Sequence, residues 1–140
     1  MEETQTYYLD TNIFIYAIIN TDKAGDKCRN FLKNIQVGKI LGITSCLTYD
    51  ELIWTLRKIC PDKIKESSKH FLNLNIKFAD VNKLVLHKTE DVLEKYNLKP
   101  RDSIHLATMQ INNCKKIVSD DKDFDKVNEI KRIDILNLNI

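Results

Sequence analysis

Glycine and proline are scarce in this 140-residue sequence, with three and two residues respectively. Average usage is about 7% for glycine and about 5% for proline. No run of serine, glycine or proline separates one part of the chain from another, so the sequence offers no candidate linker. A length of about 100 to 150 residues is ordinary for one packed domain. We therefore expect a single domain over residues 1–140.

A long apolar run is also absent. No stretch approaches the roughly 18 uncharged apolar residues of a membrane span. The N-terminal sequence MEETQTYY is acidic and lacks the basic and apolar regions of a secretory leader. Both observations argue against a membrane or secreted protein. We expect a cytoplasmic protein with no membrane partner.

The sequence contains no paired cysteines and no excess of one charge. None of the four cysteines, at positions 28, 46, 60 and 114, forms a C-x-x-C spacing, which argues against a disulfide framework or a zinc site. The 22 Lys and Arg residues nearly balance the 20 Asp and Glu residues. The net charge therefore neither requires nor excludes a polyanionic partner, and the placement of individual charges must decide.

Strand-like and helix-like stretches alternate along the chain. Short β-prone runs occupy residues 6–9, 39–45, 75–81, 115–119 and 132–136. Apolar residues recur at helical spacing after Asp10 and in residues 21–35 (behind Thr21 as N-cap), 47–59, 62–72, 81–96 and 98–109. Strands separated by helices of ten or more residues favour a parallel sheet covered on both faces. The expected fold class is therefore α/β.

Acidic residues stand where such a sheet forms its binding edge. Asp10 ends the first strand, Glu51 and Asp102 lie in the first turns of helices, and Asp120, Asp121 and Asp123 come just past the strand 115–119. Ligands of parallel α/β sheets bind at the carboxyl ends of the strands, near a switch in strand order. Asp10, Glu51, Asp102 and the acids after the strand 115–119 would then bring four distant parts of the chain to one cleft.

Each acid also has a purely structural interpretation. Asp10 could cap the following helix. Thr48 and Glu51 have the T-x-x-E spacing of a capping box. Asp102, two residues after Pro100, suits the positive end of a helix. The acidic SDDKDFD segment could be a solvated turn.

Joint placement favours a functional interpretation. Two unit charges 4 Å apart repel by about 4 kcal/mol even at an effective dielectric of about 20. A fold tolerates several neighbouring carboxylates only with a compensating cation or a shared proton. Carboxylate oxygens suit Mg²⁺ or Mn²⁺, which keep waters and bind phosphate oxygens at the same time. The chemistry indicated is cleavage of a phosphate ester.

Four segments together resemble PIN-domain proteins, especially the VapC-type toxin ribonucleases. They are YYLDTNIFIYAI, GITSCLTYDELIWTLRK, LKPRDSIHLATM and KIVSDDKDFDKV, which occur in this order between about residues 7 and 127. The resemblance implies a PIN-like, three-layer α/β/α sandwich with a central, mainly parallel sheet. It also implies an Mg²⁺- or Mn²⁺-dependent endoribonuclease that cuts RNA, with a small VapB-like antitoxin and a homodimer as its assembly.

The site residues that the resemblance implies are carried over one at a time. The catalytic and metal-binding acids of the family fall on Asp10, Glu51, Asp102 and Asp121, with Asp123 as a candidate auxiliary acid. Thr11, Asn12 and Ser119 occupy the small polar positions of the matched motifs. Asp50 adjoins Glu51 and Asp120 adjoins Asp121, so an error of one residue would exchange a site acid for its neighbour. We rank Glu51 and Asp121 first.

Further residues could assist. His105 follows Asp102 by three residues on a similar helix face, and we expect a supporting histidine rather than a metal ligand. Glu51 could orient the attacking water. Phosphate binding needs positive charge near the acids, and the candidates are Arg57, Lys99, Arg101 and Lys122. Tyr16 and Trp54 could stack on a base, although Trp54 in ELIWTL better suits a core or a subunit interface.

Four rival functions have some support in the same sequence. Phosphatases of the haloacid dehalogenase type require an aspartate two residues after the first one, and Asn12 occupies that position here. A receiver domain requires paired acids early in the chain, which MEETQTYYLD supplies poorly. A PIN-like RNA-processing nuclease without an antitoxin would carry the same four acids, and a catalytically inactive PIN-like binding or scaffold module would have no need of a defined metal site.

Overall fold

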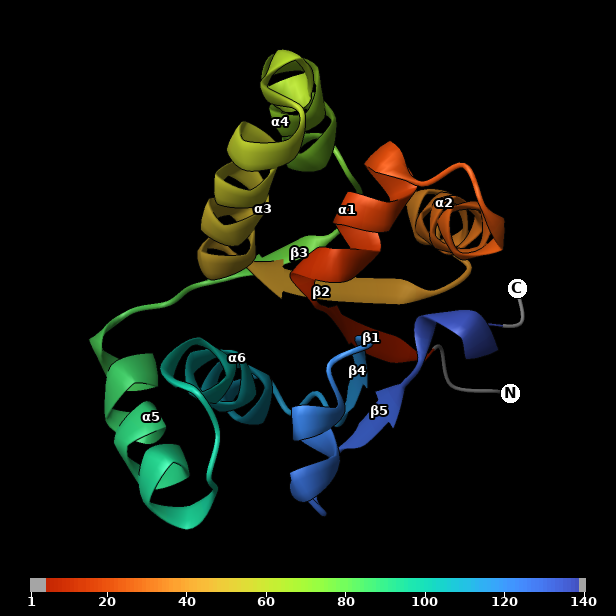
Figure 1. Cartoon of the computed structure of the whole chain (residues 1–140). Helices are drawn as coiled ribbons and strands as arrows, with labels where there is room; N and C mark the ends of the chain where they lie inside the picture. Colours follow the sequence, from red (N-terminus) through yellow and green to blue (C-terminus); the bar gives the residue numbers. More distant parts are fainter. Residues whose placement is uncertain (1–4, 139–140) are drawn as a thin grey trace.

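The computed structural model describes residues 5–138, and Figure 1 shows how the elements are arranged. The strands are β1 (Thr6–Leu9), β2 (Leu41–Ser45), β3 (Lys77–Ala79), β4 (Lys116–Val118) and β5 (Lys131–Ile133). The α-helices are α1 (Thr11–Ile19), α2 (Lys23–Gln36), α3 (Cys46–Ile59), α4 (Ile64–Leu72), α5 (Lys83–Lys95) and α6 (Pro100–Ile111). Part of the acidic N-terminal stretch and both ends of the expected domain, residues 1–4 and 139–140, lie outside the described residues.

The strands pair in the order β3-β2-β1-β4-β5, and every pairing is parallel. β1 is central, with Tyr8 in register with Ile43 on one side and Ile117 on the other. The predicted alternation of strands and helices is confirmed. The last strand is shorter than expected, because the chain turns at Asp134, whose side chain accepts the Leu136 N–H at 3.2 Å and starts a 3₁₀ turn.

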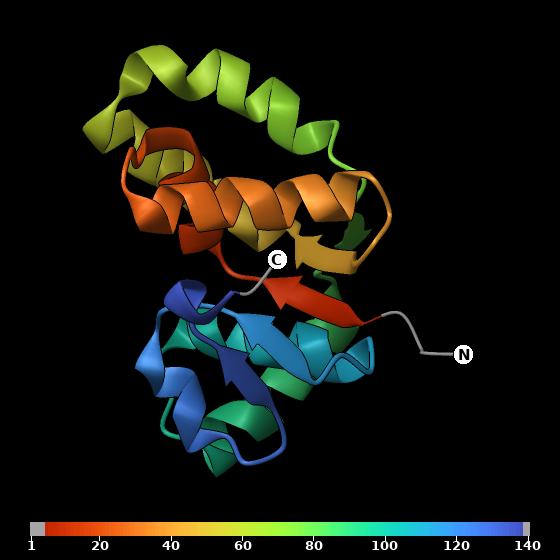
Figure 2. The same ribbon diagram turned by 90° about the vertical axis from the view of Figure 1, so that its right-hand side faces the viewer.

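Helices cover both faces of this sheet. In Figure 1, α1 to α4 lie on one side of the sheet and α5 and α6 on the other, and Figure 2 gives the same separation after a quarter turn. Neighbouring strand residues point to opposite faces. Leu9 packs in the core under α1 to α4, whereas Tyr8 packs toward α6. The three-layer α/β/α sandwich is confirmed.

Two helix starts differ from the prediction. Asp22, not Thr21, caps α2, because its carboxylate accepts the Gly25 N–H at 3.0 Å. The capping box of Thr48 and Glu51 is wrong, because α3 begins at Cys46 behind Ser45 as N-cap. Thr48 is therefore buried inside the helix, and Glu51 lies in its second turn rather than its first.

All four cysteines are free, as expected. Within residues 5–138, no helix combines the length and the apolar character that crossing a membrane requires.

Candidate active site

The site lies where the strand order reverses, between β1 and its neighbour β4. From β1 the chain goes first to β2 and β3 on one side, and later to β4 and β5 on the other. The ends of β1 and β4 are joined by a hydrogen bond from Asp10 N–H to the Val118 carbonyl at 3.1 Å. Loops leave this edge in opposite directions, which opens a crevice at the carboxyl ends of the strands.

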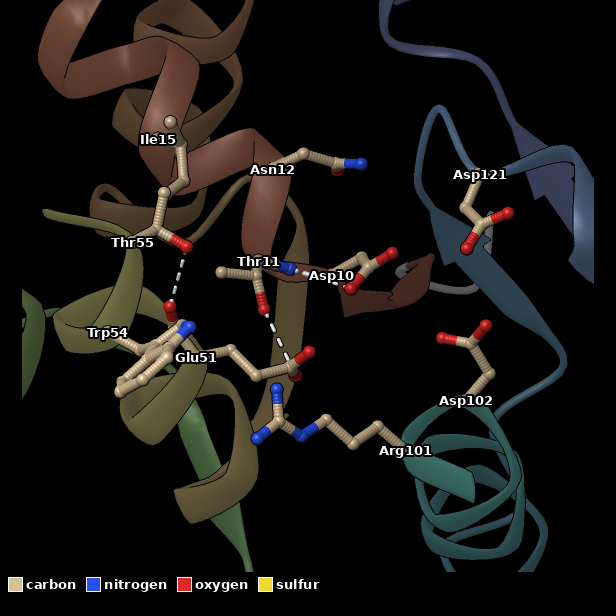
Figure 3. Close-up of a pocket in the computed structure, with 10 residues that line it drawn as sticks. All are labelled: Asp10, Thr11, Asn12, Ile15, Glu51, Trp54, Thr55, Arg101, Asp102 and Asp121. Atoms are coloured by element: carbon tan, nitrogen blue, oxygen red, sulfur yellow. Dashed lines mark hydrogen bonds between the residues drawn. The ribbon is translucent and has the colours of Figure 1, made fainter. Parts of the chain in front are cut away.

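Asp10, Glu51, Asp102 and Asp121 all line one open pocket of about 330 Å³ at this edge (Figure 3). They come from the end of β1, from α3, from α6 and from the segment after β4. The other lining residues are Thr11, Asn12, Ile15, Trp54, Thr55 and Arg101. The structure therefore brings together the four acids that the sequence motifs singled out.

Asp10 is the most buried of the four acids, with 8% of its surface exposed. Its carboxylate accepts the Thr11 N–H at 2.8 Å and the Ser119 hydroxyl at 2.6 Å. The first of these bonds is the helix cap that a structural interpretation predicts. Burial nevertheless raises the pKa of Asp10, and the hydrogen bonds from Ser119 and Thr11 only partly oppose the rise.

Asp102 faces Asp121 across the other half of the pocket. One carboxylate oxygen from each of Asp102, Asp121 and Asp123 lies within 4.8 Å of the other two. Burial raises the pKa of Asp102 to about 7, and the nearby charges of Asp121 and Asp10 add to the rise. Asp123 is tied to this group through its backbone, because its N–H donates to Asp121 Oδ1 at 3.0 Å.

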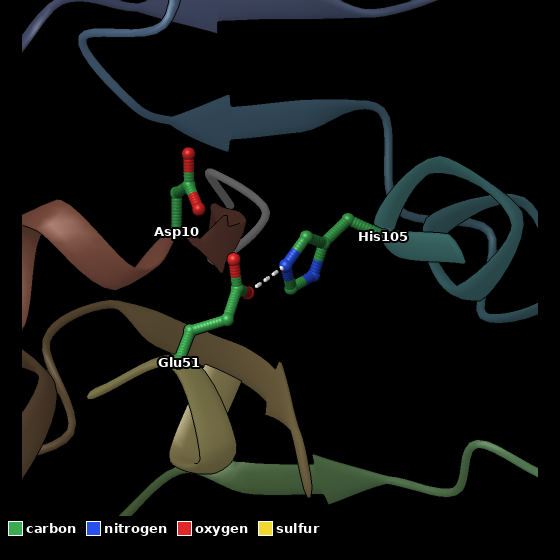
Figure 4. A group of neighbouring side chains, drawn as sticks. All are labelled: Asp10, Glu51 and His105. Atoms are coloured by element: carbon green, nitrogen blue, oxygen red, sulfur yellow. Dashed lines mark hydrogen bonds and ion pairs between the residues drawn. The ribbon is translucent and has the colours of Figure 1, made fainter. Parts of the chain in front are cut away.

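Glu51 has two hydrogen-bond partners from different elements. Its Oε1 accepts the Thr11 hydroxyl at 3.2 Å and lies 2.5 Å from Nε2 of His105 (Figure 4). His105 is fully buried, and its Nδ1 lies 2.7 Å from the hydroxyl of Tyr8, which is also fully buried. Asp10, Glu51 and His105 offer ligand atoms within 4.8 Å of one another. Both ring nitrogens of His105 are already hydrogen bonded, which favours the supporting role over a metal ligand.

Asp120 and Asp50, which adjoin Asp121 and Glu51 in the sequence, do not line the main pocket. Asp120 accepts hydrogen bonds from the Asn12 amide and the Tyr16 hydroxyl and lines a separate cavity, whereas Asp121 faces the main pocket. The hydrogen bond to Asp120 raises the pKa of Tyr16 to about 12. Asp50 is exposed on α3 and lines none of the pockets described here. The ranking of Glu51 and Asp121 over these neighbours stays a prediction that the geometry favours.

The basic candidates divide into two groups. Arg101 lines the main pocket, and in Figure 3 its side chain extends from α6 toward Glu51 and Trp54. Lys99 and Arg101 line an adjoining cavity of about 400 Å³ that shares Glu51. Arg57 and Lys122 are exposed but line neither cavity.

Trp54 does not pack in the core of the chain, so the expectation of a core position was wrong. Its side chain is 53% exposed at the wall of the pocket, with the Lys58 Nζ 4.4 Å from the ring centroid. The helical pattern of α3 places Leu52 and Leu56 on the core side. Trp54 falls two residues from each and so faces outward.

Sequence reasoning missed Tyr8. Its position in the β-prone run TYYL indicated only a core strand, and its partners Ser45 and His105 are 37 and 97 residues away. The one available signal was its hydroxyl, because a buried tyrosine hydroxyl requires a hydrogen-bond partner.

The donor set fits a hard divalent cation. Carboxylate oxygens from Asp10, Asp102 and Asp121 line the pocket. Burial raises the pKa of Asp10 and of Asp102, and neighbouring carboxylates add to both rises. The Asn12 Oδ1 atom is buried and accepts no hydrogen bond from the described residues. An oxygen-only set of this kind suits Mg²⁺ or Mn²⁺ better than a transition metal that prefers nitrogen or sulfur ligands.

Comparisons with known proteins agree with this fold. Ribonuclease VapC2 of Methanocaldococcus jannaschii is 25% identical, over 96% of this chain and 97% of its own length. Among solved structures, VapBC2 from Rickettsia felis, bound to a DNA fragment of its promoter, has a TM-score of 0.74 at 16% identity and covers 93% of this chain and 98% of its own. The sarcin-ricin loop cleaving toxin VapC20 of Mycobacterium tuberculosis has a TM-score of 0.70 at 14% identity, with 87% and 95% covered.

Sequence comparison thus supports the family resemblance, and structure comparison supports the fold. The PIN domain profile matches residues 7–130, which include all four pocket acids. The chain belongs to the PIN domain family.

Proposed function

We propose that this chain is a divalent-metal-dependent endoribonuclease that cleaves RNA phosphodiester bonds, and that it acts as the toxin of a VapBC-type pair. The observation that carries the proposal is the convergence of Asp10, Glu51, Asp102 and Asp121 on one pocket at the switch point of the sheet. The relative named Ribonuclease VapC2, which aligns over nearly the whole chain, supports the activity. The toxin and VapBC complexes among the structural relatives support the biological role.

Asp10, Glu51, Asp102 and Asp121 would hold Mg²⁺ or Mn²⁺, directly or through waters, with Asp123 beside them. Bound there, such a cation lowers the pKa of a water and offsets the negative charge that develops on the phosphate. The raised pKa values of Asp10 and Asp102 mean that these side chains bind protons readily when no cation compensates them. Protons and the divalent cation should therefore compete for the site.

The remaining steps belong to side chains of this chain. Glu51 accepts a hydrogen bond from the attacking water and directs it in line at the phosphorus. As the new bond from water oxygen to phosphorus forms, the bond to the leaving ribose oxygen breaks; the water's proton passes by way of Glu51 to solvent, and the leaving oxygen takes a proton from solvent water. Arg101 and Lys99 receive the phosphates on either side of the acids, because unscreened carboxylates would repel them. Ser119 and Thr11 keep Asp10 in place.

We further propose that the activity resides in a single PIN-like domain over residues 1–140, that the chain forms a homodimer in the cytoplasm, and that a small VapB-like antitoxin restrains it. The titles of the structural relatives name such complexes for those proteins. Co-expression with any short reading frame that adjoins the gene, followed by co-purification, tests the partner. A toxin partnered in this way should lose nuclease activity in the complex.

The purified chain should cut RNA with Mg²⁺ or Mn²⁺ and should stop when a chelator is added. Asp10→Asn and Asp102→Asn should abolish cutting while the proteins remain folded, and the exposed Asp50→Asn serves as the matched control with parental activity. Cutting by both pocket variants at the parental rate would refute the site. Absence of Mn²⁺ binding by calorimetry, together with absence of cutting, would instead identify an inactive binding module.

A further inference from the structure

A buried chain of hydrogen bonds runs from the sheet to the pocket, and none of its inner members touches the cavity. The Ser45 Oγ lies 3.0 Å from the Tyr8 hydroxyl, which lies 2.7 Å from His105 Nδ1. His105 Nε2 lies 2.5 Å from Glu51 Oε1 (Figure 4). Ser45, Tyr8 and His105 have no exposed surface, whereas Glu51 lines the pocket.

With Glu51 ionised, the contacts give every bond in the chain a direction. Glu51 is an acceptor when ionised, so His105 Nε2 must donate to it. A neutral imidazole then has a bare Nδ1, which accepts from the Tyr8 hydroxyl, and Ser45 can donate to the Tyr8 oxygen in turn. Every polar atom in the chain is satisfied without a charge on the buried ring, which is the arrangement of least cost in a dry interior.

This arrangement restricts Glu51, whose long side chain would otherwise be free to rotate. The imidazole is fixed by its own burial and by an edge contact with the Tyr8 ring, whose centroid is 5.5 Å away. The Thr11 hydroxyl adds a second donor to the same carboxylate oxygen at 3.2 Å. Glu51 thus keeps its other oxygen, Oε2, for the pocket.

We propose that His105, held by Tyr8 in its Nε2–H tautomer, is a positioning residue that fixes the Glu51 carboxylate at the edge of the pocket. This deepens the proposed function and rests on it for the effect on catalysis. Loss of the bond would leave the active-site acids in place and misdirect only Glu51. Misplacement of a catalytic group by about 1 Å can lower the rate by about 100-fold.

The first test is independent of catalysis. Nitrogen-15 NMR of His105 should show a protonated Nε2 and a bare Nδ1, with the Nε2 proton far downfield and protected from exchange. Glu51→Ala should move that proton upfield and expose it to exchange. An Nδ1–H tautomer in the parent, or an Nε2 proton that does not respond to Glu51→Ala, would overturn the proposal even if the protein proves to be a nuclease.

The second test measures cleavage. His105→Leu removes the donor and should lower kcat by about 10- to 100-fold, the usual range for residues behind a metal site, with KM for RNA little changed. His105→Gln carries an amide nitrogen near the position of Nε2 and should recover most of kcat. In a double-mutant cycle, His105→Leu should add little to Glu51→Ala, because both remove the same function.

Leu106→Val provides the matched control for stability. Leu106 is the fully buried neighbour of His105 and packs with Val85 and Val92, away from the pocket. Its substitution should lower Tm and leave kcat unchanged well below the transition. Parental kcat in His105→Leu, or additive losses in the double-mutant cycle, would show that His105 does not position Glu51 and has only a structural role. A parent that cuts no RNA would refute the proposed function, and the NMR result would then decide the positioning of Glu51 alone.

Discussion

The Ser119 hydroxyl lies 2.6 Å from Asp10 Oδ2 and binds together the ends of the two central strands. Its oxygen also accepts the N–H of Asp121 at 3.0 Å. One buried side chain thus orients an acid at the end of β1 and the backbone of an acid after β4. The raised pKa of Asp10 shows that its ionised form needs such donors.

Ser119→Ala should therefore weaken metal binding and cleavage together. We expect a loss of about 10- to 100-fold, the range found when a partner behind a metal ligand is removed. Ser119→Thr keeps the hydroxyl and should retain most of the activity. Mn²⁺ calorimetry and initial cleavage rates measure both effects, and equal losses in the two variants would show that volume rather than the hydroxyl matters at this position.

The metal-free protein should become less stable as the pH rises from about 5 to about 8. The pKa of Asp102 is about 7 in the folded chain and 3.8 ordinarily, and that of Asp10 is also raised. The folded state therefore binds more protons than the unfolded state in this window, so the free energy of unfolding falls as pH increases. Thermal unfolding in the presence of a chelator, at several pH values, measures the trend.

Asp102→Asn is the control for this trend, because it removes the charge that opposes folding. Its Tm should depend less on pH, and near pH 8 without metal it should exceed that of the parent. Asp125 and Glu129, whose pKa values are lowered by Arg132 and Lys95, affect stability only at lower pH, below about 4.5. A metal-free parent that gains stability steadily from pH 5 to pH 8 would contradict the raised pKa values of Asp10 and Asp102.

Asp120→Asn and Asp121→Asn should separate the two adjacent acids. Asp121 faces the pocket, whereas Asp120 links the segment after β4 to α1 through Asn12 and Tyr16. We expect Asp121→Asn to lose Mn²⁺ affinity and cleavage, and Asp120→Asn to lower mainly the Tm. The reverse pattern would shift the assigned site by one residue.

Arg101→Ala should weaken RNA binding without affecting Mn²⁺ affinity. Arg101 lines both cavities at the acids, and loss of one phosphate contact should reduce the slope of log K against log salt by about 0.7 for single-stranded RNA. Lys33→Ala serves as the control. The exposed Lys33 lies in the last turn of α2, and the chain then enters β2 at its start. Lys33 is therefore near the edge of the sheet opposite to the pocket. Filter binding with an uncleaved analogue measures the slope. An unchanged slope would place the phosphates elsewhere.

Much of this architecture follows from local pattern. Alternating strands and helices specify a parallel sheet, and that sheet brings the residues after β1 and β4 to one edge, so the convergence of Asp10 with Asp121 could be expected. Helix starts were less predictable. Thr48 and Glu51 have the spacing of a capping box, yet Ser45 ends its strand and begins α3 directly, which the spacing alone could not indicate.

The supporting contacts depend on packing that no short pattern encodes. In the sequence, Tyr8 has the pattern of an ordinary strand residue. Only the fold shows that its hydroxyl is hydrogen bonded to His105 of the distant helix α6. The core position expected for Trp54 was wrong for a related reason. A tryptophan in an apolar helix suggests a core position, but its location between Leu52 and Leu56 directs it away from the core.

The presence of a divalent cation among these carboxylates can be observed directly in crystals soaked with Mn²⁺ and measured for anomalous scattering. We expect a peak at about 2.0–2.3 Å from carboxylate oxygens of at least two of Asp10, Asp102 and Asp121, and no peak there in Asp102→Asn crystals treated in the same way. If the soaked crystals showed no anomalous density in the pocket, or a peak only at acids outside it, the metal-dependent nuclease site would be contradicted.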